Sequence, residues 1–177
     1  MAENKMRWKW GETNPITEPT ASSTVINAGD LLWRNSTSGK VEPASTFAKD
    51  TDLATTQAAF AAAFVGVAMQ ASPAGTAGYI RVATTGVFEF TDSTTSPSHS
   101  CGAYVGANLN AATTYLEDTK VISVAKSYLA IGRIAHVESV PSGKAFVEIC
   151  STTMRGGVAA SDPEHETASS GSDAEGT

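Results

Sequence analysis

The sequence predicts an all-β fold, a small antiparallel β-barrel or sandwich with quasi-duplicated hairpin units. Short apolar segments of four to eight residues recur along the chain. Turns rich in Gly, Pro, Ser and Thr separate these segments at a spacing of roughly ten residues, which is typical of barrels and sandwiches. One stretch, residues 50–64, has helical spacing instead, so the sequence predicts one short helix.

The composition limits the size of the core. The chain has 177 residues, of which 69 are Ala, Ser or Thr, and charged residues make up only 17% of it. Because alanine contributes little apolar area, the core must consist mainly of Val, Ile, Leu and Phe in strands. We divide the chain into an extended N-terminal arm (1–24), a β-barrel-like domain (25–151) and an acidic, low-complexity C-terminal tail (152–177).

The N-terminal arm contains a pattern with a period of two. Apolar and basic residues alternate from Lys5 to Trp10, which is typical of a strand with one apolar and one basic face. Two interpretations remain open: the arm folds back over the domain's own core, or it docks on another protein, since Trp and Arg commonly anchor interfaces. The predicted partner-binding residues are Met6, Arg7, Trp8, Lys9 and Trp10.

Residues 50–64 interrupt the strand pattern of the domain. Asp50 and Asp52 offer carboxylates that can cap a helix N-terminus, and apolar residues follow at Leu53, Phe60 and Phe64. We expect a helix of about three turns. Its apolar stripe is narrow, so it lies against a sheet or against a neighbouring subunit.

The order of segments in the domain repeats once. A turn containing Gly29 and a strand containing Gly66 correspond to Gly102 and Gly132 in the second half. We interpret this order as a degenerate duplication, with two β lobes closing one barrel. The glycines in the strands indicate bulges or sharp bends where no side chain fits.

Charge and hydropathy exclude several partners. The net charge is −6, and the chain from Val158 onward contains five acidic residues without a Lys or Arg. The remainder is almost neutral, which does not fit a nucleic-acid binder. The longest apolar run, Ala58 to Met69, is too short to span a membrane. We therefore expect neither nucleic acid nor a membrane as a partner.

The motifs of enzymes and metal sites are incomplete. Ser123-Val124-Ala125-Lys126 matches the Ser-x-x-Lys pattern of penicillin-recognising enzymes, but it lies in an expected strand and the companion motifs are absent. His99 and Cys101 are close in sequence, yet no third group completes a metal site or a nucleophile pair. The sequence thus predicts no enzyme, no cofactor and no metal site.

The succession of segments resembles a group of phage proteins. The segments are AGDLLWRNSTSGKVEP, FVGVAMQ, IRVATTGVFEF, YVG, AIGRIA and AFVEICS, within residues 25–151. They resemble the small capsid cement or decoration proteins of tailed bacteriophages, a group of unknown-function domains encoded beside the major capsid gene. The block VGVA…IRVATTGVFEF is the most specific element.

The resemblance implies a β-rich, non-enzymatic protein that attaches to the outer face of an icosahedral capsid. It implies the major capsid protein as partner, a homotrimer as the assembly and the virion as the location, after synthesis in the host cytoplasm. Such a protein cements adjacent capsid subunits and stabilises the shell.

Two other functions suit a β-rich chain. A phage tail or neck component should have a long hairpin with an apolar inner strand, which we do not find in the sequence. A small surface- or carbohydrate-binding β module needs aromatic residues clustered on one loop face, whereas Trp8 and Trp10 lie on the arm.

Overall fold

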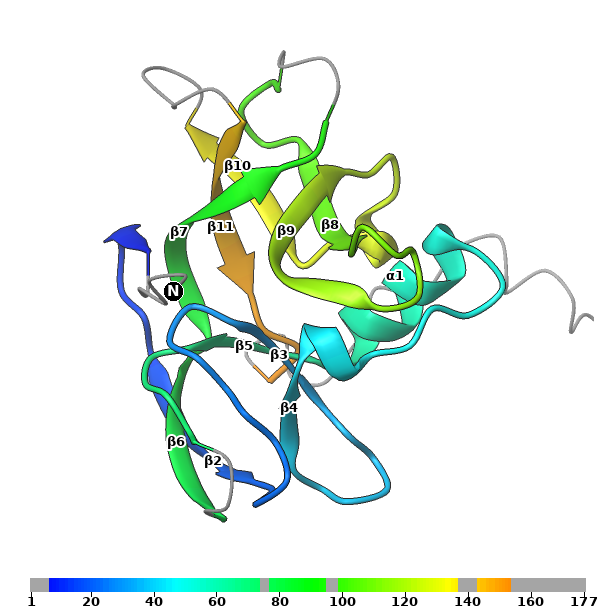
Figure 1. Ribbon diagram of the computed structural model, residues 1–177. Coiled ribbons are helices and arrows are strands. Elements are labelled where there is room, and N and C mark those ends of the chain that lie inside the picture. Colours follow the sequence, from blue (N-terminus) through cyan, green and yellow to red (C-terminus); the bar gives the residue numbers. More distant parts are fainter. Residues whose placement is uncertain (1–6, 74–76, 95–98, 137–142, 154–177) are drawn as a thin grey trace, which may run out of the picture.

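Two closed β-barrels make up the body of the chain (Figure 1). The computed structural model describes residues 7–73, 77–94, 99–136 and 143–153. Thr84 alone separates the last strand of the first barrel from the first strand of the second. The predicted all-β fold with one short α-helix is confirmed. The sequence predicted a single barrel, however, and the structure has two.

The smaller barrel is formed by the first half of the chain. Its strands are β2 (Pro15–Thr20), β3 (Leu31–Arg34), β4 (Val41–Pro43), β5 (Phe64–Ala68) and β6 (Gly78–Ala83), in the order β2-β4-β3-β5-β6. The pairings are antiparallel except that of β2 with β4, which is parallel and joins Thr20 to Val41. This one parallel pairing closes the ring.

The larger barrel follows in the second half. Its strands are β7 (Thr85–Asp92), β8 (Tyr104–Leu109), β9 (Leu116–Ser123), β10 (Gly132–His136) and β11 (Lys144–Cys150). The order is β7-β11-β10-β8-β9, and a parallel pairing of β7 with β9 closes the ring. A further strand, β1 (Trp8–Trp10), adds to β7 from outside.

The two barrels have the same topology. In each, the first strand pairs with the third in parallel and with the fifth in antiparallel orientation. The turn before the second strand also repeats: Gly29 N–H donates to the Ala68 carbonyl and Gly102 N–H donates to the Ile134 carbonyl, both at 2.8 Å. This repetition confirms the quasi-duplicated hairpin units, with each unit closing a barrel of its own.

Gly66 in β5 and Gly132 in β10 lie where the backbone passes too closely for a side chain. A Cβ added at Gly66 would lie 2.0 Å from the carbonyl oxygen of Ala83, and a Cβ at Gly132 would lie 2.2 Å from that of Glu148. Gly66 also has a φ of +148°, which L side chains rarely adopt. The prediction that no side chain fits at these two glycines is confirmed.

The helix α1 (Leu53–Ala63) follows the 3₁₀ turn η1 (Ala44–Thr46) and runs directly into β5. Asp52 is its N-cap, and the carboxylate accepts the Thr55 N–H at 2.7 Å. The helix packs against β8 and η2 (Ser127–Leu129), where Gln57 Nε2 donates to the Ala107 carbonyl at 2.7 Å. The predicted helix is confirmed, and it lies against a sheet of its own chain.

The strand β5 separates two apolar clusters. Phe64 and Val67 belong to the main cluster, which includes Phe60 of α1 and the interior of the larger barrel. Val65 and Ala68 belong to a second cluster inside the smaller barrel. Every residue of β5 is buried, so this strand forms the wall between the two cores.

The structure corrects the extent of the N-terminal arm. Residues 15–20, which we assigned to the arm 1–24, form β2 and pair with β6 along their whole length. The segment contains two prolines, which are uncommon within strands because Pro cannot donate to a ladder. Pro15 and Pro19 are separated by an even number of positions, so the N–H that each of them lacks would lie on the same side of the strand. β2 pairs there with β4 at Thr20 alone.

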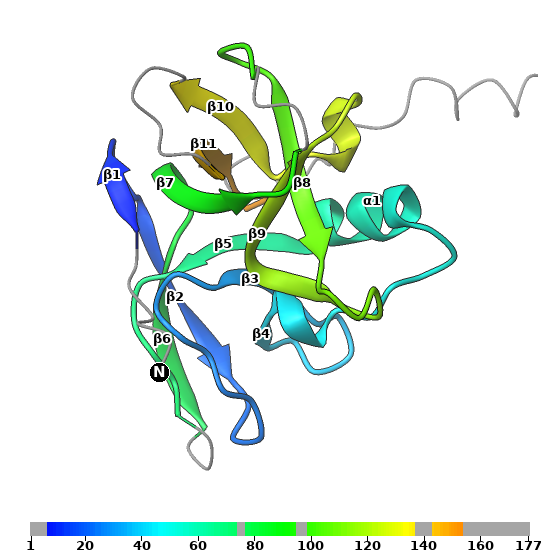
Figure 2. The same cartoon turned by 45° about the horizontal axis from the view of Figure 1, so that its top comes forward.

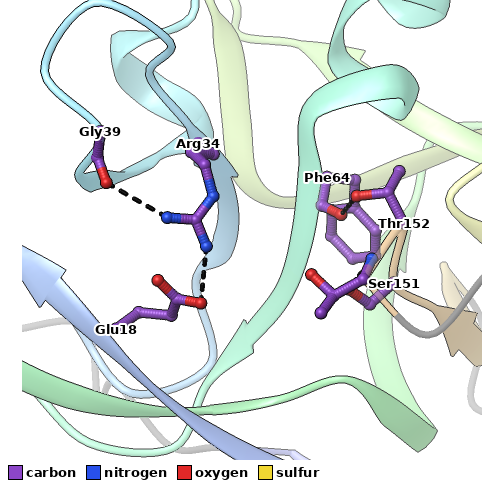
Figure 3. Close-up of polar contacts among 7 residues, drawn as sticks. Glu18, Arg34, Gly39, Phe64, Ser151 and Thr152 are labelled. Carbon is purple, nitrogen blue, oxygen red and sulfur yellow. Dashed lines mark hydrogen bonds and ion pairs between the residues drawn. The ribbon is translucent and has the colours of Figure 1, made fainter. Parts of the chain in front are cut away.

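Polar contacts join β2 to β3, and join Thr152, at the C-terminal end of the described chain, to β5 (Figure 3). Arg34 Nη2 lies 2.6 Å from the largely buried carboxylate of Glu18, and Arg34 Nη1 donates to the Gly39 carbonyl at 3.1 Å. At the other end, Thr152 Oγ1 donates to the Phe64 carbonyl at 2.8 Å. The remainder of the predicted acidic tail lies outside the described residues.

Two carboxyl groups with raised pKa values lie near the contact of β3 with β9. Burial, with a smaller contribution from the negative charge of Asp118, raises the pKa of Asp30 from 3.8 to about 7, although Asp30 accepts the Asn27 N–H at 2.7 Å. Burial also raises the pKa of Asp118, whose Oδ1 accepts the Ser45 N–H at 2.6 Å. Ionisation of Asp30 therefore destabilises the fold.

Gly66→Ala should lower the free energy of unfolding by about 3 kcal/mol or more, because the new methyl group must displace backbone atoms of β6. Urea denaturation followed by tryptophan fluorescence measures the loss. Gly78→Ala is the matched control, since no heavy atom lies within 4 Å of a Cβ at that position and no positive φ is involved. Equal stability of the two variants would contradict the close approach at Gly66.

Asp30→Asn should stabilise the chain at high pH only. Folding raises the pKa of Asp30, so the neutral carboxyl group stabilises the folded state relative to the charged one. This contribution is complete below pH 3.8, the ordinary pKa of an Asp, and is lost as the pH rises through about 7. We expect the variant to gain up to about 4 kcal/mol at pH 8 and almost nothing at pH 4. Denaturant titrations at both pH values measure the difference, and an equal effect at both would contradict the raised pKa.

Candidate partner-binding surface

The strand β1 lies on the side of the larger barrel opposite α1 (Figure 2). Trp8 pairs with Phe88 of β7, and Trp10 pairs with Val87. β9 pairs with the same edge of β7 only at residues 91–92, so β1 occupies a part of the edge that β9 leaves open. Among the strands that the structure describes, β1 alone pairs with a single neighbour.

Glu89 of β7 holds two basic side chains, Lys9 of β1 and Arg7, which directly precedes β1. Its carboxylate lies 2.7 Å from Lys9 Nζ and 3.6 Å from Arg7 Nη1, and its N–H donates to the Arg7 carbonyl at 2.9 Å. The two cationic side chains are 35% and 38% exposed, so each pair contributes about 1 kcal/mol or less. One carboxylate against two cations leaves this end of the strand positively charged.

Each of the two tryptophan side chains of β1 contacts a neighbouring group of the protein and remains partly exposed. Trp8 Nε1 donates to the Gly11 carbonyl at 3.1 Å. The Trp10 ring packs edge-on against Phe146, with 5.6 Å between ring centroids. The exposed fractions are 47% for Trp8 and 42% for Trp10. Indole rings that are positioned but not covered are typical of interface anchors.

The alternation of an apolar and a basic face, predicted for this strand, is interrupted. The register with β7 shifts between Trp8 and Trp10. Lys9 Nζ consequently lies 5.2 Å from the centroid of the Phe146 ring, the same ring that Trp10 contacts. A register shift of this kind re-aims side chains locally. The β1 surface therefore places a cation and an indole together instead of separating them.

A cleft of about 580 Å³ adjoins β1. Its lining includes Trp10, Glu12 and Asn14 from the N-terminal segment, and Arg133 and Glu148 from the larger barrel. The Arg133 guanidinium lies 4.8 Å from the ring centroid of Tyr104 and donates to its hydroxyl at 3.3 Å. The cleft thus offers an aromatic face, an oriented guanidinium and carboxylates.

Three of the five predicted partner-binding residues, Trp8, Lys9 and Trp10, form β1, and Arg7 directly precedes it; Met6 lies outside the described residues. The arm folds back onto its own domain, as one of the two interpretations expected. Docking of these residues on another protein stays a prediction. The sequence reasoning missed Glu89, Phe146 and Arg133, because strand pairing rather than sequence spacing brings them to this surface. The one signal was the charged Glu89 between two phenylalanines.

The incomplete motifs occupy other parts of the larger barrel. Ser123 ends β9, as expected for a strand residue, and does not begin a helix. Cys101 Sγ donates to the Ala135 carbonyl at 3.4 Å, while His99 contacts other groups. Within the described ranges, no cluster of His, Cys, Asp and Glu is suited to hold a metal ion, and no helix is long and apolar enough to cross a membrane.

The fold and this surface define a duplicated double-barrel protein with an aromatic edge strand. No protein-family model matches the chain, and no curated protein matches it. Among solved structures, it is similar to the head fiber gp8.5 N base of bacteriophage phi29, with 9% identity, 76% of this chain and 93% of that chain covered, and a TM-score of 0.43. A match at this level assigns neither family nor function, so the proposals below rest on the residues of this chain.

Glu89→Gln should loosen β1 from β7, because the uncharged side chain holds Lys9 and Arg7 less strongly. Hydrogen–deuterium exchange of the peptide spanning β1 should quicken about fivefold, which corresponds to roughly 1 kcal/mol. Glu117→Gln, which removes the ion pair with Lys120 on β9 at 3.4 Å, should leave that exchange unchanged. Unaltered exchange in both variants would contradict the anchoring role of Glu89.

Proposed function

We propose that this chain is a structural protein of a tailed-bacteriophage virion that binds the outer surface of the icosahedral capsid and cements adjacent major capsid protein subunits. The observation that carries the proposal is the coincidence of two features on β1. This strand is the one with a single neighbour in the described part of the chain, and it also bears two half-exposed tryptophans. A second chain can extend such an edge by strand pairing and cover the indole rings.

The proposed role needs binding energy but no reaction. A cement protein contributes through buried apolar area and through many copies acting on one shell. The segments of residues 25–151 that resemble phage cement proteins make up most of the two barrels. Closed barrels leave few open strand edges, and this favours one defined contact over non-specific association.

We further propose that the chain acts as a homotrimer, which would present three β1 surfaces around a threefold position of the shell. Three linked contacts dissociate far more slowly than one, because a released contact rebinds at a high effective concentration. Analytical ultracentrifugation of the full chain measures the assembly. A monomer at all concentrations would contradict this part of the proposal.

Cosedimentation with expanded capsids that lack the protein tests the main proposal. We expect saturable binding by the wild type and a higher temperature of shell disruption. The double variant Trp8→Ala/Trp10→Ala should bind at least about 30-fold more weakly, the loss expected for interface anchors worth 2 kcal/mol.

Tyr79→Ala is the matched control, because Tyr79 is an aromatic residue 71% exposed on β6 of the smaller barrel. Circular dichroism confirms that the variants are folded. Equal binding by the double variant and the control would contradict the β1 surface as the contact. A stable wild-type oligomer that binds no capsid would favour a tail or neck component instead.

The cleft beside β1 supports a second candidate function, binding of a saccharide. Trp10 supplies a ring face on which a sugar can stack, and Arg133 and Glu148 supply hydrogen-bonding groups next to it. Calorimetric titration with bacterial surface oligosaccharides separates the two functions. Binding of an oligosaccharide that is lost in Glu148→Ala, without any binding to capsids, would favour the saccharide function.

A further inference from the structure

Three polar side chains form a hydrogen-bonded chain at the end of the larger barrel where β7 and β9 meet. Asp92 ends β7 and Ser123 ends β9, and the parallel pairing of the two strands places Asp92 beside Val121. His99 lies between the two side chains. Its Nε2 is 2.5 Å from Asp92 Oδ2, and its Nδ1 is 2.8 Å from Ser123 Oγ.

The burial of the three groups is graded. The side chains of Asp92 and His99 are only 6% and 10% exposed, whereas Ser123 is an exposed residue. The second carboxylate oxygen of Asp92 accepts the Thr94 N–H at 2.8 Å, which fixes the orientation of the carboxylate. The protein thus buries the acid and the imidazole, whereas the serine at the end of the chain of contacts is exposed.

These contacts determine where the protons lie. A carboxylate only accepts hydrogen bonds, so Nε2 of His99 carries the proton in its contact with Asp92. In the neutral ring, Nδ1 then has the lone pair and accepts the hydroxyl proton of Ser123. A hydroxyl bound to an imidazole that a buried carboxylate orients is the arrangement of an activated nucleophile.

We infer that Ser123, His99 and Asp92 form a nucleophile, base and positioning acid that react with small acyl esters from solution. Ser123 Oγ attacks the acyl carbon while His99 Nδ1 takes the hydroxyl proton. The bond from the acyl carbon to the leaving oxygen then breaks, and His99 returns the proton to that oxygen as an alcohol forms. Water hydrolyses the acyl-serine by the same route, releasing the carboxylic acid and restoring the Ser123 hydroxyl.

The surrounding backbone limits the expected rate. The N–H of Ser123 donates to Thr94 Oγ1 at 3.2 Å, and the N–H of Val124 donates to the Tyr104 carbonyl at 3.0 Å. Neither amide is therefore available to stabilise the oxyanion, a contribution of about 100- to 1,000-fold where it is present. We expect the acceleration that a general base supplies, at the lower end about 100-fold.

The competing explanation is a purely structural link between the ends of β7 and β9. Both explanations predict that loss of His99 destabilises the barrel, so stability does not distinguish them. The reactivity of the Ser123 hydroxyl distinguishes the two explanations, because a structural link requires no nucleophile. Ser123→Ala is the informative variant, since an exposed alanine at the end of a strand leaves the fold intact.

The experiment treats the full chain with p-nitrophenyl acetate and, separately, with a fluorophosphonate probe. We expect the wild type to release p-nitrophenol about 100-fold faster than Ser123→Ala, and to carry a single phosphonyl group that peptide mass spectrometry places on Ser123. Ser36→Ala, which removes an exposed serine of the smaller barrel, should react like the wild type.

Asp92→Asn distinguishes positioning from direct contact with the ester. It should lower kcat at an unchanged KM, because Asp92 touches His99 and not the substrate. Equal release of p-nitrophenol by the wild type and Ser123→Ala, or a probe adduct on another residue, would overturn the inference. The assay contains no capsid, so its outcome is independent of the proposed virion role.

Discussion

The arrangement of the two barrels depends on how the chain holds Thr84, the one residue between them. Thr84 is completely buried and is bound to two other segments of the chain. Its N–H donates to the Thr13 carbonyl at 2.9 Å and its hydroxyl to the Asn14 carbonyl at 2.7 Å, while its own carbonyl accepts the Ser151 N–H at 2.9 Å. Asn14 adopts a φ of 39°, which asparagine tolerates better than most residues. The start of β2, the link between the barrels and the end of β11 therefore meet at one point.

This junction also explains the position of β1. Because Thr13 and Asn14 are fixed beside Thr84, the residues just before them are delivered to the edge of β7 that begins at Thr85. Thr85 Oγ1 donates to the Glu12 carbonyl at 2.7 Å and extends the same attachment. The aromatic edge strand is thus a consequence of how the barrels are joined, and the proposed contact with a capsid has a rigid base.

Duplication accounts for much of the remaining structure. A five-stranded unit that closes on itself buries its own strand edges. The second copy is fused to the first through one residue, and the cores of the two units pack against different side chains of β5. The close approaches at Gly66 and Gly132 repeat as well, since in each unit a glycine of the fourth strand lies against a backbone carbonyl of the fifth strand. The inserts differ: the first unit has α1 before its fourth strand, and the second has only η2.

The sequence could predict those features that depend on local chemistry. Asp52 and the apolar spacing after it indicate a capped helix, and glycines within strands indicate close backbone contacts. Barrel closure could not be predicted, because each ring closes through a short parallel pairing between distant residues, such as Thr20 with Val41. β2 was missed because it contains two prolines, which are uncommon within strands. The neighbours of β1 were missed because they come from strands that are adjacent only after folding.

The same limit applies to the polar chain of Asp92, His99 and Ser123. The sequence suggested His99 with Cys101, the nearest candidate along the chain, but the pairing of β7 with β9 brings His99 to Ser123 instead. A search by spacing finds helical and loop motifs, whereas groups assembled across a sheet need the strand register. Incomplete motifs in a β-rich sequence therefore do not exclude polar groups that the fold brings together.

The most direct test of the proposed function is a cryo-electron microscopy map of expanded capsids decorated with the full chain. The account predicts density for both barrels on the outer face, with β1 against the major capsid protein and the rings of Trp8 and Trp10 covered by it. Bound protein with β1 facing solvent and another surface against the shell would contradict the central claim.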